Sequence, residues 1–265
     1  MIRIKKEPDT LYAILAITRF TLLEAMRNRL IWLFIILLLL GIMLAEFMGG
    51  ISITESHAIR TSLLGAILRI FAVFVVSLYV ITSMLREMND KGMELTLSLS
   101  VSRASYYFGK LSGYALIAFF ISLLIGFCLL YYAPFPQVLI WTVSLYCELL
   151  IISALCLLCV YTFSQVTIAI TAVAAFYVLA RTIDAIQLMG KGSMIDPNSL
   201  TQTFMIKAVG SLAYLLPDLY RFSPSEWLIY TDTDSGQLMP IIIQTVIYLF
   251  VLIAAGLFDL YRKNL

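Results

Sequence analysis

The chain has 265 residues, of which 62% are hydrophobic and 13% charged, and its mean hydropathy is +0.96. This composition excludes an ordinary water-soluble protein and indicates an integral membrane protein, because runs of about 20 apolar residues cross a bilayer as helices. A formal net charge of +2 without a dense basic patch argues against nucleic acid as a partner. No polar stretch is long enough to fold separately, so residues 1–265 are expected to form one transmembrane domain.

The first 29 residues precede any strongly apolar span. Residues 1–10 form a short basic tail suited to a cytoplasmic surface, and they do not resemble a signal peptide. Residues 10–29 have helical periodicity with an apolar and a polar side, which predicts an elbow helix lying in the membrane interface. The alternative is a cytoplasmic extension of the first span. The charged residues of this helix are Arg19, Glu24 and Arg27, and Arg19 falls on the apolar side, where it must snorkel or find a partner.

Six hydrophobic spans are predicted, at residues 30–48, 63–85, 107–132, 138–162, 165–186 and 239–259. An even number places both termini on one side of the membrane. Basic residues are concentrated near the termini and between the second and third spans, so these parts are expected to be cytoplasmic. The third span begins with Gly109 and Gly113, a spacing that permits close packing of another helix and is a weak dimerisation signal.

Residues 86–106 form a charged cytoplasmic loop between the second and third spans. Burying so many charges in lipid would cost about 2.5–3.5 kcal/mol each, so the loop must lie in water or against a protein. Gly92 is expected to stop a helix or make a turn, and residues 93–98 to form a short helix presenting Met93, Leu95 and Leu97. Ser102 is a good N-cap for the following helix.

On the other side, residues 187–238 form a long extracytoplasmic segment, and Pro134 and Pro136 make a tight turn near residues 133–137. Residues 199–216 are predicted to be a helix that ends before Pro217. The segment is either an ordered cap or a gate. Residues 218–230 supply aromatic anchors for the membrane interface, namely Tyr220, Phe222, Trp227 and Tyr230.

The search for catalytic chemistry is mostly negative. His57 is the single histidine, and Gly109-Lys110 lacks the upstream glycine of a nucleotide-binding P-loop, so no enzyme site, metal site or ATP site is expected in this chain. Cys156 and Cys159 have CxxC spacing inside an apolar span, where buried packing is the expected role. A soft-metal path along Met84, Met88 and Met93 is conceivable, but packing explains these residues as well.

Ionisable residues inside spans are costly and normally face a cavity or a partner. Glu148 lies near the middle of the fourth span and is expected either to serve a transport pathway or to be a hydrogen-bonded structural carboxyl. Glu46 and Arg69 lie toward the same ends of adjacent spans and are expected to pair, with Glu148 completing a possible substrate pathway. Arg181 and Asp184, three residues apart, suggest a local ion pair.

The layout resembles type-2, export-class ABC transporter permeases: an elbow helix, two spans, a charged coupling loop and four more spans with an outer segment before the last. In the loop, Glu87 and Asp90, then KGMEL at 91–95, SVSR at 100–103 and FGK at 108–110 are similar to that family's motifs. LLPDLYRF at 215–222 and FDLYRKNL at 258–265 resemble a NosY-like branch associated with multicopper-enzyme maturation. Ser100 replaces the family's usual proline, and Glu94 follows Gly92 by two residues instead of three.

The resemblance implies a non-enzymatic permease subunit in a bacterial or archaeal cytoplasmic membrane, with both termini cytoplasmic. It would work with a second permease chain, identical or homologous, and with a separate ABC ATP-binding subunit that holds ATP and Mg. It implies that residues of the loop dock that subunit or brace the loop, and these are Arg86, Glu87, Asp90, Gly92, Glu94, Arg103 and Lys110. An ion-coupled secondary transporter or channel that uses Glu148 is the alternative, and an intramembrane enzyme is a weaker one.

Overall fold

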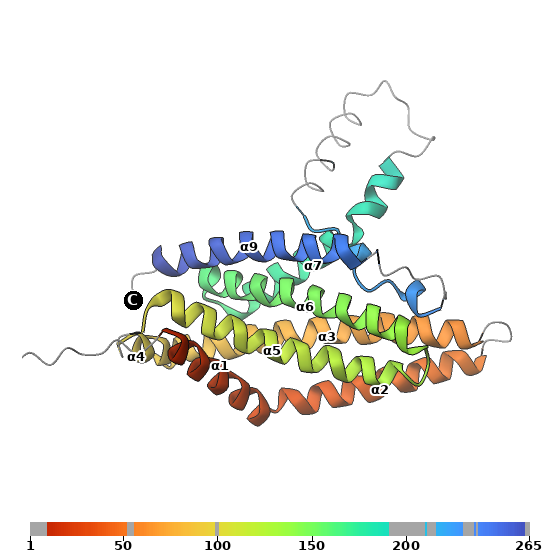
Figure 1. Ribbon diagram of the computed structural model, residues 1–265, viewed down its shortest axis with the longest axis horizontal. Coiled ribbons are helices and arrows are strands. Elements are labelled where there is room, and N and C mark those ends of the chain that lie inside the picture. Colours follow the sequence, from red (N-terminus) through yellow and green to blue (C-terminus); the bar gives the residue numbers. More distant parts are fainter. Residues whose placement is uncertain are drawn as a thin grey trace, which may run out of the picture.

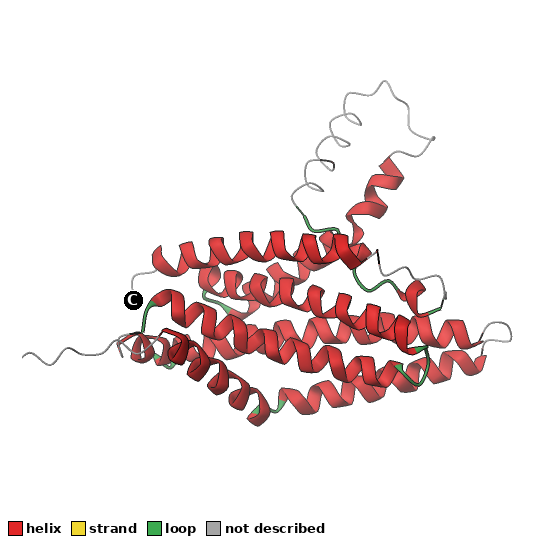
Figure 2. Ribbon diagram, viewed as in Figure 1, coloured by secondary structure: helices red, strands yellow, loops and turns green. Residues whose placement is uncertain are grey.

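The protein is an all-α integral membrane protein, and the part of the chain that the structure describes contains six long apolar helices. The computed structural model describes residues 10–51, 56–98, 101–190, 210, 216–229, 236 and 238–262, and these ranges contain helices and turns but no strand (Figures 1 and 2). Six helices are long and apolar enough to cross a membrane: α2 (Leu30–Ile51), α3 (Ser56–Asn89), α5 (Arg103–Leu129), α6 (Phe135–Phe163), α7 (Val166–Gly190) and α9 (Leu238–Arg262). The predicted fold class and all six spans are therefore confirmed.

The observed helices extend past most of the predicted spans, most clearly at both ends of α3. A hydropathy pattern marks only the apolar centre of a span, whereas the helix continues through flanking polar residues that satisfy their backbone in the same way. The turn between α5 and α6 agrees with the prediction. Pro134 is the N-cap of α6, and Pro136 lies in its first turn, where a missing N–H costs nothing.

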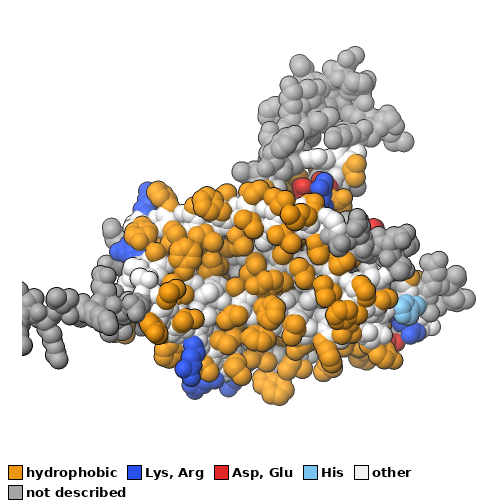
Figure 3. Space-filling view, in the orientation of Figure 1, with side chains coloured by type: hydrophobic (Ala, Val, Ile, Leu, Met, Phe, Trp, Pro, Cys, Tyr) orange, Lys and Arg blue, Asp and Glu red, His pale blue; other side chains and the backbone are white. Residues whose placement is uncertain are grey.

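Helix α6 forms the centre of the bundle. It packs against α3, α5, α7 and α9, whereas α2 packs mainly on α3 at the periphery. Trp141 and Leu145 of α6 are completely buried, and so is a run of its small residues, including Ser153 and Ala154. Figure 3 shows an outer surface that is largely hydrophobic, as expected where lipid replaces water.

Helix α1 (Thr10–Arg27) is a separate helix that lies along α5 and ends shortly before α2 begins (Figure 1). Its buried residues are Thr18, Thr21 and Ala25, so the small and hydroxyl-bearing face packs inward. The more apolar side, with Tyr12, Leu15 and Met26, is exposed. The elbow helix thus exists, and its polar side is covered by protein.

The close approach of α1 to α5 depends on glycine. A Cβ added at Gly109 would lie 2.8 Å from Ile17 Cβ, and one at Gly113 would lie 2.7 Å from Thr21 Cβ. No methyl group fits at either distance. The Gly109-x-x-x-Gly113 spacing therefore serves packing inside the chain, between α5 and the elbow helix.

Residues 216–229 run between α7 and α9 as two short 3-10 turns, η1 (Leu219–Arg221) and η2 (Ser225–Leu228). Both turns insert their apolar residues among the spans, with Leu219, Phe222 and Leu228 buried. Phe222 was predicted to be an interface anchor, and this is wrong because its ring lies in the core. The predicted helix at 199–216 falls almost wholly outside the described residues, as does Tyr230.

Two ends of the bundle are distinguished below. Helix α4 (Gly92–Ser98), the start of α5 and the last residues of α9 lie together at what we call the α4 end (Figure 1). The turn between α5 and α6 lies at the opposite end.

Candidate functional site

The α4 end carries the short helix predicted from the loop sequence. Helix α3 ends at Asn89, and the chain reverses at Lys91, which has a left-handed φ of 56°. Gly92 was expected to make this turn, but Lys91 takes the left-handed conformation and Gly92 is the first residue of α4. A Cβ added at Gly92 would lie 3.1 Å from Glu87 Cγ, so a larger residue there would require the Glu87 side chain to shift slightly.

Helix α4 is anchored on one side and open on the other. The Met93 side chain is only 2% exposed and belongs to the core, whereas Leu95 is 66% exposed. Glu94 is also exposed, and so are Arg86, Asp90 and Lys91 just before α4. An exposed leucine among charges of both signs resembles surfaces that bind grooves on other proteins. In such surfaces the apolar contact contributes affinity and the charges fix the orientation.

Two residues predicted for docking lie behind this surface. Lys110, 5% exposed on α5, forms an ion pair with Glu87 of α3, and the Tyr106 hydroxyl donates to Glu87 Oε1 at 2.9 Å. The three side chains form a clamp between α3 and α5. The Met84 sulfur lies 3.9 Å from the same hydroxyl oxygen and packs against it. The clamp braces the helices that carry α4.

The elbow helix is attached to the same region. Ser83 donates to Glu24 Oε1 at 2.8 Å, and Tyr79 donates to the Thr21 carbonyl at 3.2 Å. Glu24 therefore braces α1 against α3. The other two predicted elbow residues, Arg19 and Arg27, are exposed, and Arg19 lies on the exposed apolar side of α1 with Leu15 and Met26, as predicted.

Arg103 has a bracing role that differs from the expected one. Its guanidinium donates to the carbonyls of Leu260 and Tyr261, each at 3.1 Å, and lies 5.9 Å from the centre of the Tyr261 ring. These carbonyls belong to the last turn of α9, where unpaired acceptors and the negative end of the helix dipole favour a cation. Ser102 caps the start of α5 as predicted, accepting from the Ser105 N–H.

A second polar cluster lies deep in the bundle toward the opposite end, around Glu148. This carboxylate is 0% exposed. Its Oε1 accepts from the Tyr177 hydroxyl at 3.0 Å and from Arg181 Nη1 at 3.2 Å, and its Oε2 accepts from the Ser223 hydroxyl at 2.8 Å. A buried charge needs an ionic partner and hydrogen bonds together, and Glu148 has both.

Ser223 is the centre of this cluster, although its sequence context gave no sign of it. It is fully buried, with a left-handed φ of 43°. Its N–H donates to the Ser144 hydroxyl at 2.8 Å, and its carbonyl accepts from Trp141 Nε1 at 3.0 Å and from Arg69 Nη1 at 2.8 Å. Every polar atom of Ser223 is bound, so the 216–229 segment is fixed to α3 and α6.

Arg181 connects the Glu148 cluster to η1. Besides Glu148, it donates to the carbonyls of Leu219 at 2.7 Å and Phe222 at 3.3 Å. The predicted local pair between Arg181 and Asp184 is wrong. Arg181 faces inward because two turn carbonyls and a buried carboxylate outcompete a half-exposed carboxylate on the same helix.

The predicted pair between Glu46 and Arg69 is also wrong. Glu46 pairs with Arg60 at 3.3 Å and accepts from the Tyr132 hydroxyl at 2.7 Å, whereas Arg69 binds Ser223 deeper in the bundle. Burial and the neighbouring Glu46 carboxylate raise the pKa of Tyr132 to about 12. Glu46, Arg60 and Tyr132 thus form a separate, exposed contact at the opposite end of the bundle. The three residues predicted for a substrate pathway, Glu46, Arg69 and Glu148, do not share one site.

The two clusters have no group arranged for bond-making chemistry. Cys147, Cys156 and Cys159 are buried free thiols, and the part of the chain that the structure describes contains no group of three His, Cys, Asp or Glu side chains placed to hold a metal. The Glu148 cluster is closed by buried ionic and hydrogen bonds, whereas the α4 surface is open and carries an exposed leucine among charged side chains.

The contributors that sequence reasoning missed are Ser144, Trp141, Tyr177 and Ser223. Ser144 lies one helical turn before Glu148, and this spacing was visible in the sequence. Nothing in the sequence of residues 216–229 indicated that Ser223 would pack beside Glu148. Comparison with known proteins does not assign a family, since no family model and no curated protein matches the chain.

Proposed function

We propose that the chain is the membrane-spanning subunit of an ATP-driven transporter and that α4 docks a separate ATP-binding subunit. The observation that carries the proposal is the form of α4: Met93 is buried as an anchor while Leu95 and Glu94 face outward. A short helix held rigidly at the end of two spans, with an apolar residue exposed among charges, suits mechanical coupling to a soluble partner.

The clamp behind α4 supports a route for that coupling. Force on α4 passes to α3 through the Lys91 turn and to α5 through the Glu87–Lys110 pair. Helix α3 is unbroken over its 34 residues and passes through Arg69, whose guanidinium holds Ser223. A movement at the α4 end would therefore be transmitted along α3 to the Glu148 cluster.

In this proposal ATP and Mg belong to the partner, and a second permease chain, identical or homologous, completes the transporter in a bacterial or archaeal cytoplasmic membrane with both termini in the cytoplasm. The alternative in which Glu148 carries ions or protons is not put forward. Glu148 is enclosed and engaged by Arg181, Tyr177 and Ser223, which favours a structural carboxylate.

The test is a mild-detergent pull-down of the tagged chain from its native membranes, with mass spectrometry and an ATPase assay on the eluate. We expect a P-loop ATPase to copurify. The variant Glu94→Lys with Leu95→Asp should lose it, while Glu226→Lys, an exposed charge reversal near the opposite end, should retain it.

Two results would contradict the proposal. One is an eluate that contains this chain without any nucleotide hydrolysis, under conditions that keep other membrane complexes intact. The other is undiminished ATPase recovery with the α4 variant, which would place the docking surface elsewhere.

A further inference from the structure

A basic pocket and an apolar groove meet at the junction of α1 and α2. The pocket has a volume of about 560 Å³ and is lined by Arg27, Asn28, Arg29, Leu30, Leu78, Thr82 and Arg86. Three of these residues are arginines and none is a carboxylate. Figure 3 shows Lys and Arg side chains gathered over α1 at the lower edge of an otherwise apolar surface.

These arginines lack a neutralising carboxylate among the residues that the structure describes. Within the described ranges no carboxylate pairs with Arg27, Arg29 or Arg86, and the nearby Glu24 is engaged with Ser83. Helix α2 begins at Leu30 with no acidic residue in its first turn, so the positive end of its dipole faces the same place. Three guanidinium groups beside a helix N-terminus repel one another unless an anion lies among them.

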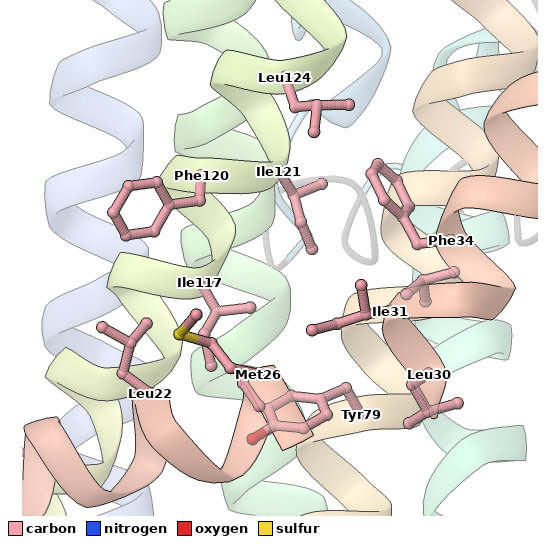
Figure 4. Close-up of a pocket in the computed structure, with 12 residues that line it drawn as sticks. Leu22, Met26, Leu30, Ile31, Phe34, Tyr79, Ile117, Phe120, Ile121 and Leu124 are labelled. Carbon is pink, nitrogen blue, oxygen red and sulfur yellow. The ribbon is translucent and has the colours of Figure 1, made fainter. Parts of the chain in front are cut away.

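The apolar groove begins where the pocket ends, and Leu30 lines both. It has a volume of about 360 Å³, within the range of sites that hold small ligands. Figure 4 shows Phe120, Ile121 and Leu124 of α5 on one side and Ile31 and Phe34 of α2 on the other. The wall residues are apolar apart from the Tyr79 hydroxyl, which is donated to the Thr21 carbonyl.

We propose that this composite site binds one anionic phospholipid, with its phosphate among Arg27, Arg29 and Arg86 and an acyl chain along the groove between α2 and α5. A soluble anion would use only the pocket, and a zwitterionic lipid would gain little from three arginines. A phospholipid with net negative charge matches both halves, since clustered basic residues between membrane helices select anionic headgroups. The site shares Arg86 with the charges beside α4, and its other residues belong to α1, α2, the turn between them, α3 and α5.

The test uses the purified full chain in mild detergent, with lipid retention measured by native mass spectrometry and thermal stability measured in parallel. The probes are phosphatidylglycerol, phosphatidylcholine of the same chain length, and glycerol phosphate as the headgroup alone. We expect preferential retention and stabilisation by phosphatidylglycerol and no stabilisation by glycerol phosphate. Each arginine should contribute about fivefold to the preference, the equivalent of about 1 kcal/mol for a basic residue at an anionic lipid surface.

Three variants separate the halves of the site. Arg29→Gln with Arg86→Gln should lower the preference for phosphatidylglycerol about 25-fold, following the same scale. Ile121→Trp, which fills the groove, should reduce retention of both lipids. Arg19→Gln, which removes an exposed charge from α1 outside the pocket, should change neither.

The proposal fails if the wild-type chain holds both lipids equally, or if Arg19→Gln lowers the preference as much as the double variant does, because general surface charge would then explain it. It also fails if glycerol phosphate stabilises the chain as well as the lipid does. Self-association that excludes lipid from the groove, seen as a dimer without bound lipid, would assign the groove to a second copy.

Discussion

At the scale of single residues, the stability of the bundle depends on Glu148. Removing its charge while keeping its shape, as in Glu148→Gln, leaves Arg181 and Arg69 without a buried counter-charge. Losing one partner of a buried ion pair costs about 3–5 kcal/mol. We expect a large fall in the thermal unfolding temperature in detergent.

Two control variants test whether the loss of stability comes from the buried pair of Glu148 and Arg181. Glu46→Gln breaks the exposed pair with Arg60 and should cost at most about 1 kcal/mol. The double variant Glu148→Gln with Arg181→Gln should be less destabilised than the sum of its single variants, because no buried charge is left unpaired. Additive costs would show that the two side chains do not act as a pair.

Asp218, just before η1, gives a pH-dependent effect. Burial and the nearby Asp184 raise the pKa of Asp218, while Arg221 acts against them. Because the folded-state pKa lies above the unfolded value of about 3.9, the folded state holds the proton more tightly and the carboxylate opposes folding at neutral pH. Stability should therefore rise as the pH falls through the folded pKa toward 3.9.

The variant Asp218→Asn should thus unfold at a higher temperature than the wild type at pH 7 and at the same temperature below about pH 3.9, where both side chains are neutral. Thermal scans in detergent across this range measure the difference. Glu226→Gln, an exposed carboxylate on the same segment, should change little at either pH. A wild type more stable than Asp218→Asn at pH 7 would reverse the sign and disprove the assignment.

At the scale of helices, glycine decides how α1 lies on α5. Gly113→Val places a branched side chain where even a Cβ would be 2.7 Å from Thr21. Overpacking of this kind costs about 1–3 kcal/mol, and α1 should separate from α5. Disulfide cross-linking between cysteines placed at Thr18 and Ser112, whose hydroxyls are hydrogen-bonded, measures the separation.

Gly50→Ala is the matched control, since no atom lies within 4 Å of a Cβ added there. It should leave both stability and cross-linking unchanged. Equal cross-linking in Gly113→Val and wild type would mean that α1 tolerates the larger side chain.

The positions of the helices could be predicted from the sequence, whereas their partners could not. Long apolar runs identify spans because every backbone group in lipid must be satisfied within the helix. The elbow helix and the Ser102 cap were predicted for similar local reasons. Periodicity predicted the two faces of α1 correctly, and the exposed apolar face fits a helix in the membrane interface, but the pattern gave no sign that the polar face packs on α5.

The polar clusters also show that the sequence indicates which residues are unusual but not which residues they contact. Glu148 could be singled out because a mid-span carboxylate is costly, yet its partners Tyr177 and Ser223 lie 29 and 75 positions away in sequence. Pairing by proximity in sequence failed for Arg181 and Asp184. Spacing in the sequence indicates which residues can meet on one helix. The partners of a buried charged side chain come from other helices, and the spacing does not show them.

At the scale of the whole molecule, the clamp between α3 and α5 should separate docking from coupling. Lys110→Met removes the cation that pairs with Glu87 and leaves the exposed α4 surface unchanged. If α4 docks an ATP-binding subunit, the partner should still copurify, while the effect of the membrane chain on its ATPase rate should fall several-fold. The ratio of ATPase rate to copurified partner measures the separation.

Arg19→Gln is the control, because Arg19 is an exposed cation on α1, away from α4, that makes no ion pair within the described residues. It should preserve both binding and stimulation. A Lys110→Met variant that keeps full stimulation would mean that force does not pass through the clamp.

Arg103 has a consequence for how the protein is made. It stands at the start of α5, yet the carbonyls it caps belong to Leu260 and Tyr261, more than 150 positions later in the chain. During synthesis α5 is made before α9, so the contacts of Arg103 with these two carbonyls can form only late. Because the start of α5 and the end of α9 must reach the same end of the bundle, this contact joins an early part of the chain to the last span only once that span is in place.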